Sequence, residues 1–158
     1  MGDTVAIATI ALTLHIFSAV VWVGGMFFAL IVLRPATAAL DSLPRLELWL
    51  RVFERFFVWV FAAVVLLLAS GYAMVFGVFS GFGGIGLHVH IMQALGIVMM
   101  LLFFHLYFAP WRRFRAALAR QDPATAATQL GQIRTIVTVN LLLGLLTVAV
   151  GSSGRYWG

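Results

Sequence analysis

Four long apolar runs dominate this sequence, and each is long enough to cross a lipid bilayer. They cover about residues 5–33, 56–79, 87–109 and 135–151. A membrane-spanning helix needs about 20 mainly apolar residues, and within the hydrocarbon a single segment satisfies its backbone hydrogen bonds as a helix. Charged residues make up 9% of the chain, against about 25% in soluble domains. We therefore predict an all-α membrane protein, a four-transmembrane-helix bundle, with residues 1–158 as a single domain.

The distribution of positive charge predicts how the bundle sits in its membrane. All ten basic residues are arginines, and all except Arg155 lie in or beside the first and third connections between the runs. Because loops rich in arginine stay in the cytoplasm, we expect an up-down bundle with both termini on the periplasmic side of a bacterial inner membrane. The sequence has no continuous run of basic residues that could bind successive phosphates of a nucleic acid. The expected partner is therefore the lipid bilayer and not a nucleic acid.

Histidines lie in or at the ends of the apolar runs: His15, His88, His90 and His105. A histidine at membrane depth normally faces the bundle interior and marks a functional site. His15 lies 19 residues before Arg34, and His90 lies 22 residues before Arg112. At the helical rise their heights therefore differ by only about 4–5 Å. His105 lies about 22 Å from His90 along the third predicted helix, so it has no partner at its own height.

Angular positions add to this pattern. His90 and His105 are about 60° apart around the third helix, whereas His88 points about 160° away from His90. Further candidate site residues recur at helical spacing on the first helix or lie on a small-residue stripe of the fourth: His15, Ser18, Trp22, Gly25 and Asn140. Such faces predict helix contacts and an interior site built from several helices.

The matched heights of His15 and His90 predict a haem b site. A low-spin haem needs two axial ligands on opposite faces of one ring, and axial ligands and burial then set its potential. We expect His15 and His90 to ligate the iron, with His88 as the alternative to His90. Arg155 is the basic residue expected nearest the propionates.

Copper is the alternative metal, because imidazole and thioether ligands suit Cu(I). The methionines available for it are Met26, Met74, Met92, Met99 and Met100. Met92 follows His90 by two residues and so points elsewhere. No pair of methionines at one-turn spacing stands out, so the residues favour haem over copper.

Several stretches of the chain together resemble a known family. They are residues 14–28, 33–35, 53–57, 70–72 and 87–90, with His105 and Asn140. This set resembles the CopD-type bacterial membrane proteins, and it is similar to HemJ, the membrane protoporphyrinogen oxidase of the same superfamily. The resemblance covers most of the chain and implies a four-helix inner-membrane protein that binds haem b. It also implies His88 as the family histidine, and Arg34 and Arg55 as candidate functional positions.

The chain departs from the HemJ pattern at two motifs. A lysine of that pattern corresponds to His90 here, and its Asn-Glu-x-Pro motif is reduced to Asn140. The resemblance therefore does not favour protoporphyrinogen oxidation. The CopD-type proteins are named for copper resistance and uptake, which keeps a copper-binding or copper-transporting protein as the alternative.

The expected function is haem b binding for electron transfer or haem-dependent oxidoreduction near the periplasmic face. Whether the protein is an enzyme stays open, and a purely structural subunit of a larger complex is a third hypothesis. The expected partners are haem, a redox partner in the membrane or periplasm, and a second copy of the chain in a homo-oligomer. The cofactor-binding candidates are His15, His88, His90, His105, Trp22, Gly25, Arg34, Arg55, Asn140 and Arg155.

Overall fold

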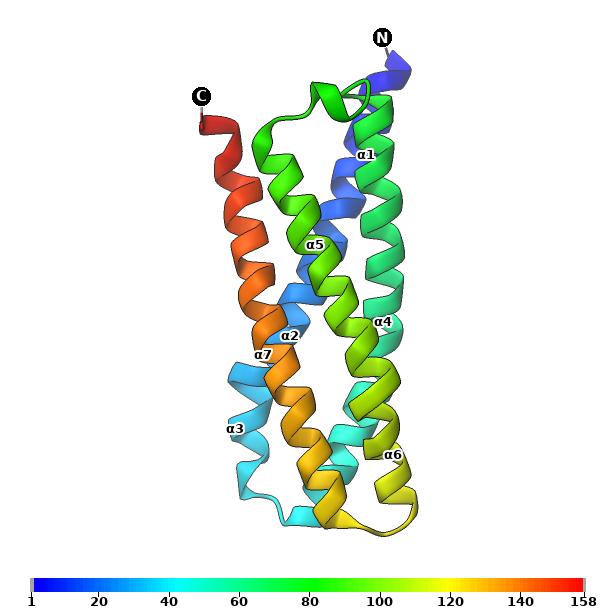
Figure 1. Ribbon diagram of the computed structural model, residues 1–158, viewed down its shortest axis with the longest axis vertical. Coiled ribbons are helices and arrows are strands. Elements are labelled where there is room, and N and C mark those ends of the chain that lie inside the picture. The colour runs from blue at the N-terminus through cyan, green and yellow to red at the C-terminus, as the bar shows by residue number, and fades with distance from the viewer. Residues whose placement is uncertain (1, 158) are drawn as a thin grey trace.

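A computed structural model describes residues 2–157, and the side chains of Asp3 and Arg155 lie outside that description. The described chain contains four helices that are long and apolar enough to cross a membrane: Thr4–Ala39, Ser42–Gly77, Leu87–Ala119 and Pro123–Ser153. They run alternately up and down, and the first and last helices have their free ends at the same end of the bundle (Figure 1). The predicted all-α, four-helix architecture is confirmed.

The first long helix is not uniform, because two π-helical stretches interrupt it. It consists of α1 (Gly2–Ala19), the π-helix Val20–Gly24, α2 (Gly25–Phe27), the π-helix Phe28–Leu33, α3 (Arg34–Ala36) and the 3-10 turn Thr37–Ala39. Pro35 follows the second π-helical stretch, where the regular i→i−4 hydrogen-bond ladder is already displaced, so its missing N–H does not end the helix. The helix therefore continues beyond the predicted end at residue 33.

The third long helix passes a proline in the same way. α5 (Leu87–Leu106) is followed by the π-helix Tyr107–Trp111, which contains Pro110, and by α6 (Arg112–Ala119). The wider turn accommodates the proline ring, and the helix continues ten residues beyond the predicted end of the run at residue 109. Both departures from the sequence prediction thus have one cause, a π-helical turn beside a proline.

α4 (Ser42–Gly77) and α7 (Pro123–Ser153) are unbroken helices. The Asp122 carboxylate caps α7 by accepting a hydrogen bond from the Thr125 backbone N–H at 3.0 Å. Hydrogen bonds from the side chain and backbone of Thr125 hold the pKa of Asp122 below its usual value. The cap is therefore fully present at neutral pH and is lost only when the pH falls through that lowered pKa. α7 ends in the 3-10 turn η6 (Gly154–Tyr156).

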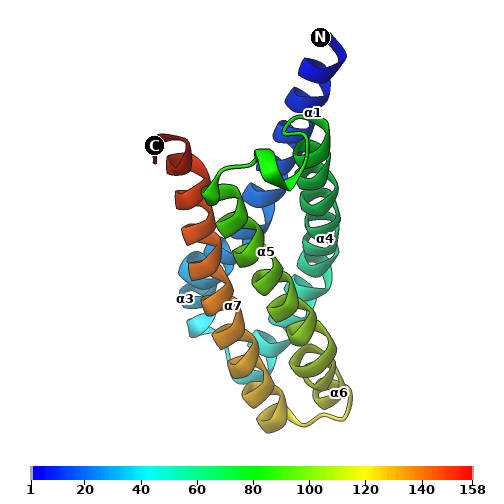
Figure 2. The ribbon, with the colours of Figure 1, turned by 45° about the horizontal axis from the view of Figure 1, so that its top comes forward.

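The connection between α4 and α5 is rich in glycine and contains the 3-10 turn η4 (Phe82–Gly84). Gly81 has a φ of +102°, a left-handed conformation that glycine adopts without steric cost. Figure 2 shows this connection crossing the end of the bundle above α5. It lies at the same end as the two chain termini.

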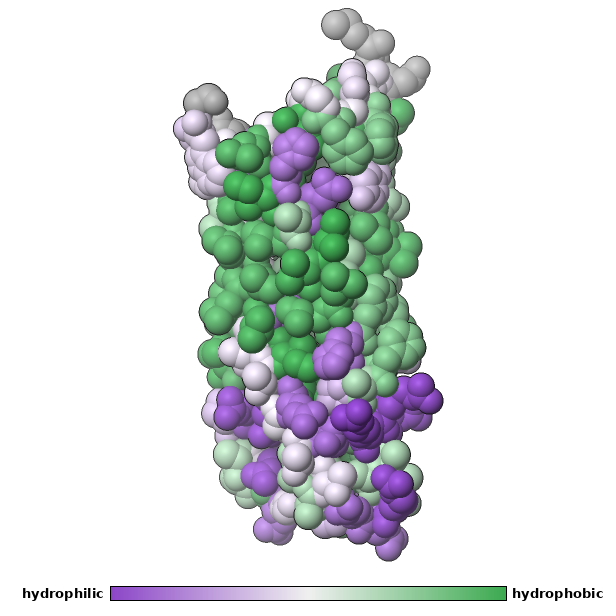
Figure 3. All heavy atoms as spheres, viewed as in Figure 1, coloured by the Kyte–Doolittle hydropathy of each residue, from purple (hydrophilic) through white to green (hydrophobic). Residues whose placement is uncertain are grey.

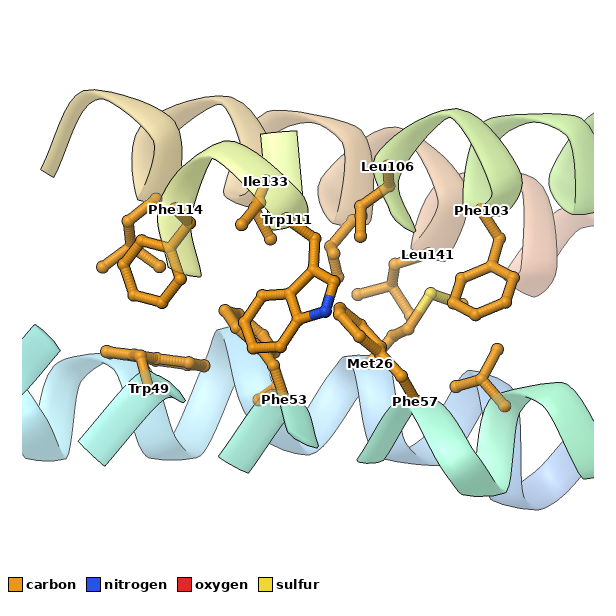
Figure 4. Packing of buried hydrophobic residues seen from close by; sticks show 14 of the residues in the cluster. Met26, Trp49, Phe53, Phe57, Phe103, Leu106, Trp111, Phe114, Ile133 and Leu141 are labelled. Carbon is orange, nitrogen blue, oxygen red and sulfur yellow. The ribbon is translucent and has the colours of Figure 1, made fainter. Parts of the chain in front are cut away.

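The helices pack as two principal pairs, α1 along α4 and α5 along α7. An aromatic cluster joins the pairs around Phe57 (Figure 4). The Phe57 ring meets the rings of Phe103, Tyr107 and Trp111 edge-on, with centroid separations of 5.7, 6.0 and 5.2 Å. Edge-to-face pairs of this kind contribute beyond their buried area. The cluster therefore fixes how the two helix pairs sit against each other.

The surface divides along the length of the bundle (Figure 3). Apolar side chains cover the middle and hydrophilic ones gather at one end. We call this the arginine-rich end; it carries the turn between Ala39 and Ser42 and the turn between Ala119 and Pro123. Large apolar residues such as Trp59 (63% exposed) and Phe17 (64% exposed) face outward from the middle. Such a belt of exposed apolar side chains suits contact with lipid.

Candidate functional site

The seam between α5 and α7 brings together three side chains with donor atoms for soft metals. His88, Met92 and Met99 lie four and seven residues apart on α5, within about 40° of one another around the helix. Met92 and Met99 face glycines of α7, and His88 faces Gly154 just beyond its end. A Cβ at Gly151 would lie 3.1 Å from the Met92 sulfur, and a Cβ at Gly144 would lie 3.1 Å from Met99 Cε.

The outer end of this seam is closed by His88. Its side chain packs directly on Gly154 of η6, and its ring meets the Trp157 ring edge-on at 6.4 Å. His88 and Met92 are half-buried and Met99 is 4% exposed. The seam thus runs from a half-buried imidazole near the chain termini to a buried thioether about 16 Å deeper. We call these three residues the His–Met column.

The sulfur of Met99 keeps its lone pairs available. The Thr147 hydroxyl lies 3.9 Å from it, but the same hydroxyl is 2.8 Å from the Leu143 carbonyl and donates its one proton there. Asn140 lies one turn before Gly144 on α7, and its amide donates to the Met99 carbonyl at 3.2 Å. Its buried Oδ1 has no partner among the described residues. Asn140 thus fixes the backbone that carries Met99.

His15 lies against α4. Its Nδ1 is 3.0 Å from the Ser70 hydroxyl, which itself donates to the Leu66 carbonyl. The Ser70 oxygen therefore accepts from Nδ1–H of His15, and in a ring that carries one proton the remaining lone pair is on Nε2. A metal-binding histidine is commonly oriented in this way by a hydrogen bond from its other ring nitrogen.

The other two histidines lie on the surface of the described bundle. His90 and His105 are both exposed. Gln93, one turn after His90, donates to the Tyr72 hydroxyl of α4 at 3.2 Å. Iron ligation by His90 stays a prediction, but the residue that the structure encloses at the start of α5 is His88, the predicted alternative.

The remaining candidate residues do not converge on one place. Trp22 is 2% exposed and meets Phe103 edge-on at 6.1 Å. Gly25 lies against the Phe56 ring, and Arg34 and Arg55 are exposed. The Arg155 side chain, expected near the propionates, is outside the described part of the chain. Trp22 and Gly25 pack between helices, and their place beside a cofactor stays a prediction.

One surface groove lies between α4 and the third long helix, and a second lies on the third long helix alone. Their volumes are about 200 and 230 Å³, and neither is lined by a histidine. An ion pair between Glu54 and Arg115, 3.9 Å apart, borders the first. Ligand pockets usually have volumes of about 300–1,000 Å³. These grooves are therefore too small for a porphyrin.

The sequence reasoning missed the His–Met column because it started from His90. Met92 indeed points away from His90, as predicted, but it shares a face with His88. The signal was present in the spacing: His88, Met92 and Met99 repeat at four and seven residues, and Gly144 and Gly151 repeat at seven on the helix that receives them.

Fold and site together define a multi-pass membrane protein with imidazole and thioether donors along one helix seam. The model of a family described as CopD, Copper resistance protein D, matches residues 50–153, about two thirds of the chain. The chain belongs to the CopD family, and the resemblance identified from the sequence is confirmed. The match includes the whole His–Met column and begins after His15. No curated protein and no solved structure matches the chain.

Proposed function

We propose that the protein binds monovalent copper in the membrane at the His–Met column. The single observation that carries this proposal is the alignment of His88, Met92 and Met99 on one face of α5, against glycines of α7 and η6. Imidazole nitrogen and thioether sulfur are ligands that Cu(I) accepts. The name of the family, which refers to copper resistance, agrees with this chemistry.

The two ends of the column have different roles. Half-buried His88 lies near the end of the bundle where Cu(I) can arrive from water or from a donor. Met92 and Met99 offer neutral sulfurs deeper in the apolar seam. Thioether sulfurs are soft ligands that suit Cu(I), so they can replace its hydration in the apolar seam. Glycines on α7 leave room for the methionine ends to move toward the ion.

The experiment measures Cu(I) affinity of the purified protein by competition with a chromophoric Cu(I) chelator without oxygen. We expect one Cu(I) per chain and a loss of affinity on the order of tenfold or more in the double variant Met92→Leu, Met99→Leu. Leucine conserves volume, so packing is retained. Met100→Leu is the matched control, because Met100 lies about 100° away around α5. Equal Cu(I) affinity in the double variant and the control would refute Cu(I) binding at the His–Met column.

Haem b binding through His15 is the second candidate function. The contact of His15 Nδ1 with Ser70 favours it, because it orients the ring and assigns the lone pair to Nε2. A bound haem would supply one-electron redox chemistry, and this chain would contribute the axial nitrogen and its orientation. The visible spectrum of the same purified protein decides the matter. A Soret band that is lost in His15→Ala but kept in His105→Ala supports haem, whereas a colourless preparation excludes it.

We further propose that the arginine-rich end faces the cytoplasm and both termini face the periplasm of a bacterial inner membrane, as the distribution of arginine favours. The chain contains no cysteine, so a single introduced cysteine can be labelled without background from native thiols. A cysteine at Gly83, where a Cβ meets open space, should react with a membrane-impermeant maleimide in intact cells. A cysteine at exposed Ala124 should react only after permeabilisation. The reverse pattern would invert the orientation.

A further inference from the structure

Three arginines from three different helices approach one another at the arginine-rich end. Arg34 is the first residue of α3, Arg45 lies in the first turn of α4, and Arg134 lies on α7. The Arg134 guanidinium lies over the ring of Trp49, one turn after Arg45 on α4, and the charges of Arg34 and Arg45 both act on it. The described ion pairs join Arg51 to Glu47 and Arg115 to Glu54, so no described carboxylate pairs with these three arginines. The cluster is therefore an uncompensated concentration of positive charge.

The cluster also contains buried donors without acceptors. The Arg134 guanidinium carbon lies 5.6 Å from the ring centroid of Trp49, a residue that is 2% exposed. Both Arg134 Nε and Trp49 Nε1 are buried and have no hydrogen-bond partner among the described residues. Buried donors in native proteins are nearly always satisfied. Arginines that only set membrane topology do not need to be buried, so the missing acceptor points to a ligand.

The position of the cluster narrows the chemistry of that ligand. Arg34 directly follows the first apolar run and Arg134 directly precedes the fourth. Both therefore lie at the boundary between hydrocarbon and headgroups. The N-terminus of α4 beside Arg45 adds its own free amides and partial positive charge, and its Asp41 side chain makes no capping bond. Guanidinium groups bind phosphate through paired hydrogen bonds.

We propose that Arg34, Arg45 and Arg134, with Trp49, bind a phosphate group at the membrane boundary of the arginine-rich end. The headgroup of an anionic phospholipid is the source that the boundary position favours. Free inorganic phosphate carries the same chemistry and is the other source. The site is independent of the His–Met column and does not rest on the copper proposal.

Native mass spectrometry of the detergent-purified chain tests the lipid source. Cardiolipin, phosphatidylglycerol and phosphatidylcholine are added in turn, and the bound fraction is measured. We expect the two anionic lipids to be retained and Arg134→Gln to weaken their binding about tenfold or more. Arg34→Gln should act in the same direction. Because Arg34 is exposed, this variant does not disturb the core. Arg113→Gln, an exposed arginine of α6 at the same end, is the matched control and should bind as the parent does.

A second measurement separates the two sources and the contribution of the indole. Inorganic phosphate is titrated while the melting temperature is recorded; a rise that Arg134→Gln abolishes, without lipid retention, assigns the site to free phosphate. Trp49→Phe keeps an aromatic ring beneath Arg134 but removes the indole N–H together with the five-membered ring, so it should weaken binding about fivefold. Two results would overturn the proposal: equal losses in Arg34→Gln and Arg113→Gln, or phosphatidylcholine bound as well as cardiolipin with no response to phosphate.

Discussion

Gly144→Val should separate α5 from α7 and destabilise the bundle by about 3 kcal/mol, the upper range for overpacking a tight interior. A Cβ at this position would already lie 2.8 Å from Val23 Cγ2 and 3.1 Å from Met99 Cε. Met99 can bend away, but Val23 is a short branched side chain on the first helix. Valine adds two further methyl groups, so the first helix and α5 must both move. Unfolding in a graded mixture of mild detergent and dodecyl sulfate, followed by circular dichroism, measures the loss.

The same helix provides the control for this effect. Gly131 is exposed on α7, and a Cβ there meets nothing within 4 Å. Gly131→Val should leave stability close to that of the parent, because valine has a somewhat better helix propensity than glycine. If both substitutions lowered stability equally, close packing at Gly144 would not be the cause. Gly144→Val should also weaken Cu(I) binding, since Met99 is displaced from the seam.

Trp111→Ala should destabilise the protein by about 3–5 kcal/mol, as truncation of a buried large aromatic residue usually does. Trp111 is 2% exposed and meets Phe53 and Phe57 edge-on at 5.8 and 5.2 Å. Within a membrane, lipid tails are as apolar as the helix surfaces, so the hydrophobic effect does not drive helices together. Packing contacts of this kind therefore contribute much of the association. Alanine would leave a cavity at the point where the third long helix contacts α4.

Trp59→Ala is the matched control for the truncation. Trp59 lies on α4, two residues after Phe57, but is 63% exposed on the outer face of the bundle. Its loss removes contacts with lipid or detergent and leaves the aromatic cluster intact, so stability should change by roughly 0.5 kcal/mol or less. The difference between the two tryptophan variants, measured in the same detergent series, isolates the contribution of interior packing. Similar losses in both would contradict it.

The number and order of the membrane helices could be predicted because lipid imposes a simple rule on composition and length. Their ends could not. Pro35 and Pro110 predict helix ends in an ordinary α-helix, but each lies in or beside a π-helical turn that has no periodic signature in the sequence. The first part of α4 is helical although it is polar, because Leu46 and Trp49 pack into the core.

The candidate site was predicted only in its residue types. Histidine at membrane depth is a strong signal, and all four histidines were considered. Height and angular position selected His90, but its side chain is exposed, whereas contact with Gly154 encloses His88. The pairing of Arg134 with Trp49 depends on how α4 and α7 pack together. No pattern within either segment predicts this contact. Sequence therefore supplied the donors, and tertiary packing decided which of them share a space.

The length of the first helix determines how the protein adapts to bilayer thickness. Its 36-residue candidate span would measure about 54 Å as a regular α-helix, against a hydrocarbon slab of about 30 Å. A helix longer than the hydrocarbon slab accommodates the mismatch by tilting or by extending into the headgroup layer. Long arginine side chains near its end can reach the water from several depths, so the bundle can adapt to bilayers of different thickness without burying a guanidinium.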